Sequence, residues 1–177
     1  PKVEHAVADV RTALGKAGYA DGDYVFVLAS YASPVTEKMV ALHGVRGCPF
    51  RVEDAKWGRT AAVPQLSAGL RGVAERTGVR FLDLSRATED REACSHQLRS
   101  QEWQRRLAVS PTAFATGGLA ASGHLAQESF HPSAAGQTQM GGCLGEFVRS
   151  ADNRGQCLTG PDGQLHAVAS TAVPAPA

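Results

Sequence analysis

The sequence has little net charge, no long hydrophobic run and no closely spaced pair of cysteines. The sequence of 177 residues contains no stretch of about 18 consecutive apolar residues, so we expect no stable membrane insertion. The formal net charge is +1, and the Lys and Arg residues are scattered, which argues against a nucleic-acid partner. Without a Cys-x-x-Cys pair the common zinc and redox motifs are absent, and we expect neither a metal nor a cofactor.

The cysteines are four in number and widely spaced: Cys48, Cys94, Cys143 and Cys157. An even count at such spacing favours two disulfides and therefore an oxidising compartment. Three connectivities are possible, and we favour the sequential one, Cys48–Cys94 with Cys143–Cys157. Four buried thiols in a cytosolic protein are the alternative. The chain opens on "PKVEHAVADV", an amphipathic helix and not a signal-peptide pattern, so we expect a mature or processed piece if the protein is secreted.

Hydrophobic periodicity predicts an alternation of helices and strands. The expected elements are a helix from residue 3 to about 14, a strand at 24–30, an irregular segment at 31–59, a helix at 61–77, a strand at 79–85, a polar helix at about 97–107, a helix at 132–149, and then a short hairpin. This order indicates an α/β fold with a parallel sheet. The strand at 24–30 is apolar on both faces, as in a covered central strand, yet no neighbour for it is evident. The sequence therefore resembles the second half of a doubly wound domain.

In one segment, "ESFHPSAAGQ" at 128–137, the neighbours of a histidine can fix the orientation of its side chain. Glu128 lies three residues before His131, and in a turn its carboxylate can meet the imidazole. Pro132 fixes the backbone after the histidine and begins a helix. A base held in one tautomer by a third group is what nucleophilic catalysis requires. From the residues alone, a helix cap or a solvated loop histidine is the more common role.

These residues resemble the last motif block of the SGNH (GDSL-type) hydrolases, in which a D/E-x-x-H-P segment carries the catalytic histidine. The blocks "GYADGDYVFVLASYASPV", "GCPFRVEDAKWGRTAAVPQLSAGLRGVAERTGVRFLDLSRA" and "EACS" are similar, in the same order, to the second half of its secreted actinobacterial lipase and esterase branch. The resemblance implies a three-layer flavodoxin-like sandwich with a parallel sheet, of which only the C-terminal part is present. Residues 1–150 would be that part, and 151–177 a C-terminal hairpin and tail.

The resemblance also implies the chemistry, which is ester hydrolysis through an acyl-enzyme. His131 is the catalytic residue that it assigns most directly. Glu128 matches the acid position, although a backbone carbonyl can orient the histidine in this branch. Cys48 and Cys94 match a disulfide position of the branch. The expected protein is a secreted serine esterase or lipase with an ester or lipid substrate.

The family's nucleophile block is missing from this sequence. "GDY" at 22–24 has Tyr24 where the family has serine, and it precedes a strand instead of following one. The G-x-N-D block is missing too, and Ser129 is adjacent to His131, from which sequence neighbours usually point away. We therefore expect the serine and the oxyanion donors from an N-terminal chain or segment of the same enzyme. Acyl transfer or natural-product processing on the same scaffold is one alternative, and a non-catalytic binding module without its nucleophile is another.

Two weaker candidates complete the sequence-based set. "DNRGQCLTGPDG" places Asp152 and Asp162 in one loop, but their spacing does not match a calcium-binding loop and ordinary turn chemistry explains them. Trp57 and Trp103 can line an acyl pocket, although packing in the core or over a disulfide is the more common role for such residues.

Overall fold

A computed structural model describes residues 2–40, 47–107 and 129–170. Its helices are α1 (Lys2–Lys16), α2 (Val52–Trp57), α3 (Val63–Thr77) and α6 (Ala134–Arg149). A π-helical turn, Gly58–Ala62, joins α2 to α3, and Arg99–Gln101 form a 3₁₀ turn. Its strands are β1 (Val27–Ala29), β2 (Arg80–Asp83), β3 (Arg154–Thr159) and β4 (Leu165–Ala169). Glu128 lies outside the described residues, as does the tail beyond residue 170.

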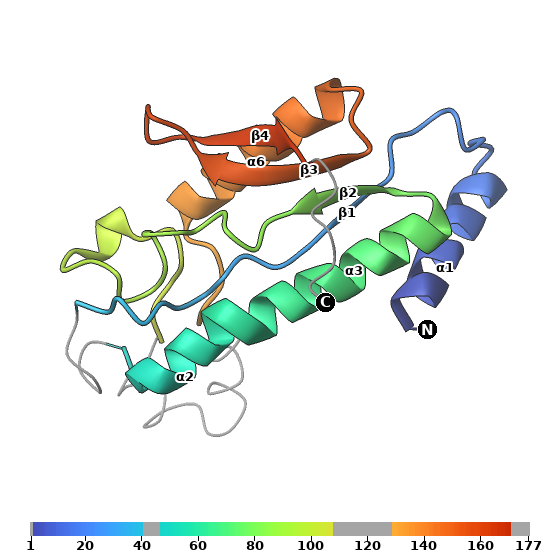
Figure 1. Cartoon of the computed structure of the whole chain (residues 1–177). Helices are drawn as coiled ribbons and strands as arrows, with labels where there is room; N and C mark the ends of the chain where they lie inside the picture. Colours follow the sequence, from blue (N-terminus) through green and yellow to red (C-terminus); the bar gives the residue numbers. More distant parts are fainter. Residues whose placement is uncertain (1, 41–46, 108–128, 171–177) are drawn as a thin grey trace, which may run out of the picture.

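The four strands form one mixed sheet in the order β1-β2-β3-β4. β1 and β2 are parallel, β2 and β3 are parallel, and β3 and β4 form an antiparallel hairpin. The hairpin expected at the C-terminal end is therefore present and belongs to the same sheet. α1 and α3 cover one face and α6 the other, so helices flank the sheet on both sides (Figure 1). The expected α/β class is confirmed, with β4 as an antiparallel addition to the predicted parallel sheet.

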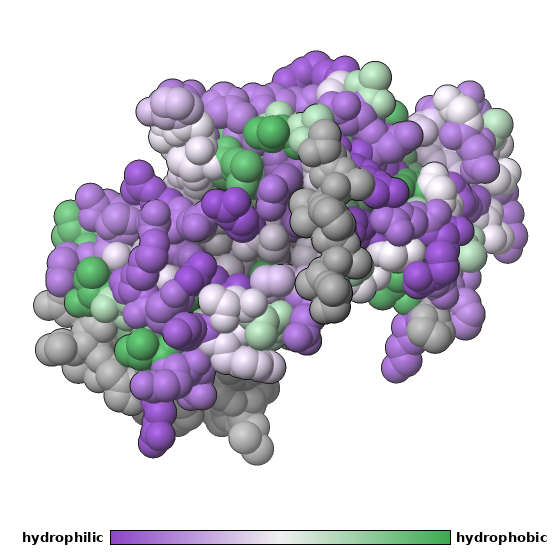
Figure 2. All heavy atoms as spheres, in the orientation of Figure 1, coloured by the Kyte–Doolittle hydropathy of each residue, from purple (hydrophilic) through white to green (hydrophobic). Residues whose placement is uncertain are grey.

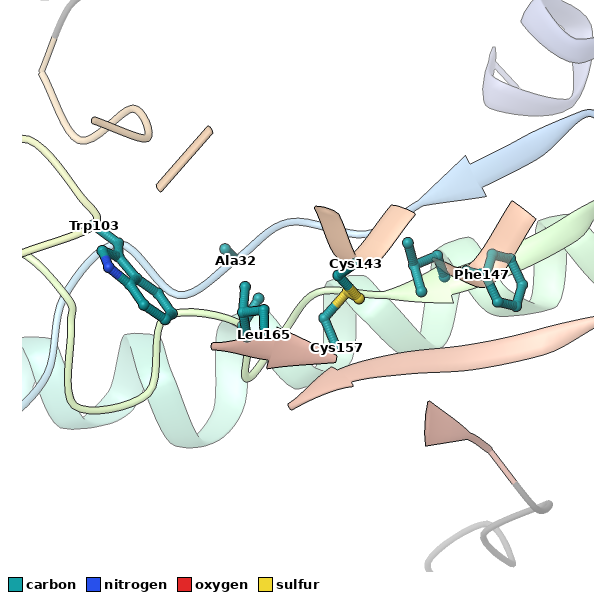
Figure 3. Packing of buried hydrophobic residues seen from close by; sticks show 8 residues of the cluster. Ala32, Trp103, Cys143, Phe147, Cys157 and Leu165 are labelled. Atoms are coloured by element: carbon teal, nitrogen blue, oxygen red, sulfur yellow. A yellow bond between two sulfur atoms is a disulfide. The ribbon is translucent and has the colours of Figure 1, made fainter. Parts of the chain in front are cut away.

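Side-chain alternation along β2 separates two hydrophobic cores. Leu82 packs against α6 with Phe147 and the Cys143–Cys157 disulfide (Figure 3). Phe81 points to the opposite face and packs with residues of α1 and α3. Successive residues of a strand point to opposite faces, so one short strand supports both layers. The face of the molecule drawn in Figure 2 is largely hydrophilic, with apolar residues in small separate groups.

Strand β1 is shorter and less covered than the sequence predicted. It pairs with β2 only, so within the described ranges it is an edge strand. Ala29 is exposed, and Val25 just before the strand is half exposed. Helix α1 also leaves part of its predicted apolar stripe uncovered, because Val7 is buried while Val3 and Val10 are not. Among the described residues β1 therefore has a strand on one side only, β2, and is not the central strand that the sequence predicted.

The second helical segment begins earlier than predicted, at Val52 instead of residue 61. Pro64 lacks an N–H and is tolerated only in the first turn of a regular α-helix, and it is the second residue of α3. The π-helical turn directly before α3 accommodates the proline, so that the helical path continues from α2 into α3. Gly78 ends α3 in the left-handed conformation, with φ +64°, as predicted for a helix stop.

The polar helix predicted at 97–107 is wrong. Only the 3₁₀ turn Arg99–Gln101 forms, and the following residues are extended, with Gln104 bridged antiparallel to Pro132. Trp103 is buried in the main core, and Figure 3 shows it at one end of this cluster, with Ala32 and Leu165 between it and the disulfide. Pairing with a distant segment thus overrides a weak local helix preference.

Helix α6 confirms the predicted helix with two differences. It begins at Ala134, because Ser133 is its N-cap and accepts a hydrogen bond from the Gly136 N–H. The buried stripe runs through Gly136, Cys143 and Phe147, whereas Leu144 and Val148 are exposed. The disulfide to β3 fixes the rotation of the helix, which a count of apolar residues did not anticipate.

Both favoured disulfides are present, Cys48–Cys94 and Cys143–Cys157. All four cysteines of the chain are therefore bonded, and no thiol is available as a nucleophile in this form. Two disulfides indicate an extracellular or otherwise oxidising compartment. No described helix is both long enough and apolar enough to cross a membrane.

Candidate active site

His131 lies in the turn that directly precedes α6. Its side chain is exposed, and its Nδ1 lies 3.0 Å from the carbonyl oxygen of Ser129. A proton on Nδ1 makes this contact a donated hydrogen bond and leaves Nε2 with the lone pair. That tautomer is the one a general base needs when it accepts a proton through Nε2.

The position of His131 in the fold is that of a site residue in α/β proteins. Arg80, at the start of β2, donates hydrogen bonds to the carbonyls of Phe147 and Ser150 at the end of α6. The start of α6 therefore lies toward the opposite end of the sheet, with the loop that follows β2 (Figure 1). In open α/β sheets, ligands bind beyond the carboxyl ends of the parallel strands, where His131 lies.

Backbone hydrogen bonds from the loop after β2 hold the His131 turn. The Arg105 N–H donates to the His131 carbonyl at 2.9 Å, and the Phe130 N–H donates to the Arg105 carbonyl at 3.0 Å. The Ser133 N–H donates to the Trp103 carbonyl at 2.8 Å. The segment that was expected to be a helix is thus a strand-like support for the histidine.

The residue before His131 has a strained backbone. Phe130 has φ +59°, in the left-handed region that residues with a Cβ rarely adopt. Such a conformation costs on the order of 1–2 kcal/mol and persists only when surrounding contacts impose it. The Phe130 ring packs edge-on against Phe50 with a centroid distance of 4.9 Å, close to the Cys48–Cys94 cluster.

Gly136 allows the start of α6 to approach the supporting loop. A Cβ at this position would lie 2.2 Å from the Trp103 carbonyl oxygen, a distance that no side chain tolerates. The Ser133 hydroxyl adds a tie at the same place, because it donates to the Glu102 carbonyl at 3.1 Å. The first turn of α6, and with it His131, is therefore fixed against residues 102–105.

The residues predicted for the site have different outcomes. His131 Nδ1 lies within hydrogen-bond distance of the Ser129 carbonyl oxygen, and its role as a catalytic base stays a prediction, whereas Glu128 lies outside the described residues. The acceptor on Nδ1 is the Ser129 carbonyl, which agrees with orientation by the backbone. Ser129 itself is buried, and its contact with the ring runs through its carbonyl oxygen. Trp103 is packed in the hydrophobic core, and Trp57 is exposed on α2.

A second polar group lies near the carboxyl end of β2. The Asp83 carboxylate accepts hydrogen bonds from the Ser30 hydroxyl at 2.9 Å and the Ser67 hydroxyl at 2.8 Å. Burial pushes the pKa of Asp83 upward, but hydrogen bonds from Ser85, Ser67 and Ser30 outweigh it and hold the pKa below its ordinary value. The hydroxyl protons are directed at a carboxylate, so the group ties α3 to the sheet.

Sequence reasoning missed the buried charged pair in the supporting loop. Glu102 and Arg106 form a bidentate ion pair, with both side chains 1% exposed. Their i, i+4 spacing was the available signal, and it is the spacing typical of helical pairs. Here it spans extended backbone instead, which only the tertiary structure shows.

The turn near Asp162 has no metal-binding arrangement. Asp162 accepts the Gln164 N–H at 3.0 Å and contacts His166 Nε2, as expected from turn chemistry. Nowhere in ranges 2–40, 47–107 and 129–170 do three or more potential metal ligands come together.

Comparisons with protein-family models, curated proteins and solved structures find no significant match to this chain. The fold and site define an α/β protein with a mixed, mostly parallel sheet and a turn-held histidine at the carboxyl end of its strands. The resemblance to SGNH hydrolases therefore stays a prediction from the sequence blocks.

Proposed function

We propose that this chain is the histidine-bearing C-terminal part of a secreted serine ester hydrolase of the SGNH type. The observation that carries the proposal is the Nδ1 contact of His131 with the Ser129 carbonyl, directly before a helix that the supporting loop fixes. The sequence order Ser-Phe-His-Pro, the exposed ring and its location at the carboxyl end of the sheet support the same role.

The proposed chemistry places the proton transfers of both half-reactions on His131. Nε2 accepts the proton of a serine hydroxyl as that oxygen attacks the ester carbonyl, and returns it to the leaving alcohol as the acyl-enzyme forms. In the second half, Nε2 accepts a proton from water as the water oxygen attacks the acyl carbonyl, and it returns that proton to the serine oxygen as the acyl–serine bond breaks and the acid leaves. The Ser129 carbonyl stabilises the imidazolium that exists between these steps, because it accepts the Nδ1 hydrogen bond.

An N-terminal chain or segment of the same enzyme supplies the serine and the oxyanion donors in this proposal. It also supplies strands beside β1, which completes a flavodoxin-like sandwich. Among residues 2–40, 47–107 and 129–170 no strand pairs with the outer edge of β1, and Ala29, Val25 and Val10 are exposed, which supports this part of the proposal. An unpaired strand edge with apolar neighbours is a surface that proteins normally cover.

Intact-mass analysis with an organophosphate tests the proposal. We expect the native protein to contain a G-D-S segment outside this sequence, and to gain one organophosphate per active site with loss of esterase activity. A native protein that consists of this 18.6 kDa chain alone and resists labelling contradicts it. That second result favours the non-catalytic binding module.

Orientation by the backbone is tested with Glu128→Ala. If the Ser129 carbonyl holds the ring, this variant keeps most of its kcat, whereas His131→Ala loses several orders of magnitude. Equal losses in the two variants would assign the orienting role to Glu128.

A further inference from the structure

The segment that supports the His131 turn has a buried polar side chain, Gln104, whose amide contacts the backbone of that turn. Gln104 is 2% exposed, and its amide group lies 3.1 Å from the carbonyl oxygens of both Phe130 and His131. Because both of these neighbours are acceptors, the hydrogen-bond network directs the NH₂ end of the amide toward them. One buried donor group thus contacts two consecutive peptide units of the candidate site.

These contacts act on the strained part of the turn. The Ser129–Phe130 peptide carries the carbonyl that meets His131 Nδ1, and its direction relative to His131 is set by the dihedral angles of Phe130. Phe130 has φ +59°, which is unfavourable without compensating contacts. Relaxation of Phe130 to negative φ rotates this peptide and removes the acceptor from Nδ1. The Gln104 amide opposes that relaxation, because it binds the carbonyl oxygens of both Phe130 and His131 and so fixes the peptide units on either side of the His131 Cα.

The Glu102–Arg106 ion pair fixes the segment that carries Gln104. Arg106 Nε donates to Glu102 Oε2 at 2.9 Å, and Arg106 Nη2 donates to Glu102 Oε1 at 2.6 Å and to the His96 carbonyl at 2.6 Å. The His96 N–H returns a hydrogen bond to Glu102 Oε1 at 3.2 Å. A buried charge that loses its partner is strongly unfavourable, so this arrangement has one well-defined geometry.

We infer that Gln104 is a positioning residue for the base His131, acting through the Phe130–His131 backbone from a segment that the Glu102–Arg106 pair holds in place. The inference rests on the proposed function of His131. It adds to that function a residue outside the histidine motif, in a segment that the sequence predicted to be a helix.

The test is Gln104→Met, which keeps the approximate volume of the side chain and removes the amide donor. The native, complete protein is used, and two quantities are measured. The first is the tautomer of His131, from the side-chain ¹⁵N shifts of histidine-labelled protein. The second is kcat and KM for a small ester. We expect the predominant Nδ1–H form to become a mixture, with kcat lower by about tenfold or more and KM nearly unchanged, because misplacement of a catalytic group affects mainly the chemical step.

Gln139→Met is the matched control. Gln139 also uses its amide between segments, accepting the Leu165 N–H at 2.9 Å, but it ties α6 to β4 at a distance from the His131 turn. We expect this variant to lose stability while the tautomer of His131 and kcat stay as in the parent. A merely structural role for Gln104 predicts that the two variants behave alike.

The outcomes separate this inference from the proposed function. Esterase activity that requires His131, with tautomer and kcat unchanged in Gln104→Met, overturns the inference and leaves the function intact. A tautomer change in a protein without esterase activity overturns the function and keeps the positioning role of Gln104. If Gln104→Met does not fold, Gln104→Glu keeps the size and places an acceptor against the two carbonyls. An unchanged tautomer in that variant then overturns the inference.

Discussion

Glu92 is a buried carboxyl group whose ionisation is expected to make stability depend on pH. It is 1% exposed, and its Oε2 has no hydrogen-bond partner among the described residues. Burial is the main cause that raises its pKa from 4.5 to about 7, and the charges of Asp90 and Glu89 act in the same direction. A backbone hydrogen bond and the charge of Arg59 lower the pKa but do not cancel the effect of burial. The perturbation is Glu92→Gln, which keeps the shape and removes the titration.

The magnitude follows from the difference between the two pKa values. Between pH 4.5 and 7 the unfolded carboxyl group is ionised while the folded one keeps its proton, so the folded state binds more protons and loses stability as the pH rises. At ~1.4 kcal/mol for each pKa unit, the loss for Glu92 is roughly 3 kcal/mol over this window. Below the window and above it, this group adds no pH dependence.

Urea unfolding with intact disulfides at pH 5, 6, 7 and 8 measures the effect. The free energy of unfolding of Glu92→Gln relative to the parent should rise by about 3 kcal/mol from pH 5 to pH 8, with most of the change below pH 7. Glu53→Gln, on the exposed first turn of α2, serves as the control for loss of one surface carboxylate. A difference between Glu92→Gln and the parent that stays constant over this range refutes the reasoning.

Three further predictions concern α6 and the hairpin. Gly136→Ala should destabilise the protein and lower activity, because the new Cβ would meet the Trp103 carbonyl of the facing loop. Gly141→Ala is the control: it has open space around it and should raise the free energy of unfolding by about 0.5–1 kcal/mol. Equal effects of the two substitutions in urea unfolding would contradict the contact at Gly136. Replacing Cys143 and Cys157 together by serine should cost about 3 kcal/mol in the chain-entropy account, and a melting temperature unchanged by this replacement would contradict it. Hydrogen bonds to Asp162 and then Glu146 raise the pKa of His166, so the stabilisation that protonated His166 gives the folded state is present below pH 6.5 and is lost as the pH rises through the raised value. Amide protection factors in β4 should therefore fall over that pH range in the parent and stay constant in His166→Gln.

Much of the fold could be predicted because its signals are local. The helices at α1 and α3 have apolar periodicity and glycine stops, and both disulfides connect in the sequential order. The π-helical turn before Pro64 was not predictable in this way, since local rules place a helix start there. The edge position of β1 also depends on which strands are present, which its own residues do not encode.

The candidate site was predictable only in part, for the same reason. The helix after His131 could be predicted from the His-Pro segment and its apolar periodicity, although it begins at Ala134 instead of Pro132. Gln104, Glu102 and Arg106 gave no signal beyond a helical spacing of charges, and their role arises from pairing with a segment far along the chain. Long-range pairing of this kind has no local pattern, so sequence periodicity predicted a helix where the structure has an extended support.

The central claim is that His131 is the base of an ester hydrolase, and the kcat of His131→Ala tests it most directly. The measurement is made on the complete protein with a small ester, with folding verified by its unfolding transition. The account predicts a loss of several orders of magnitude in kcat with an intact fold, because the exposed ring contributes little to packing. A His131→Ala protein that hydrolyses the ester at the parent rate contradicts the account.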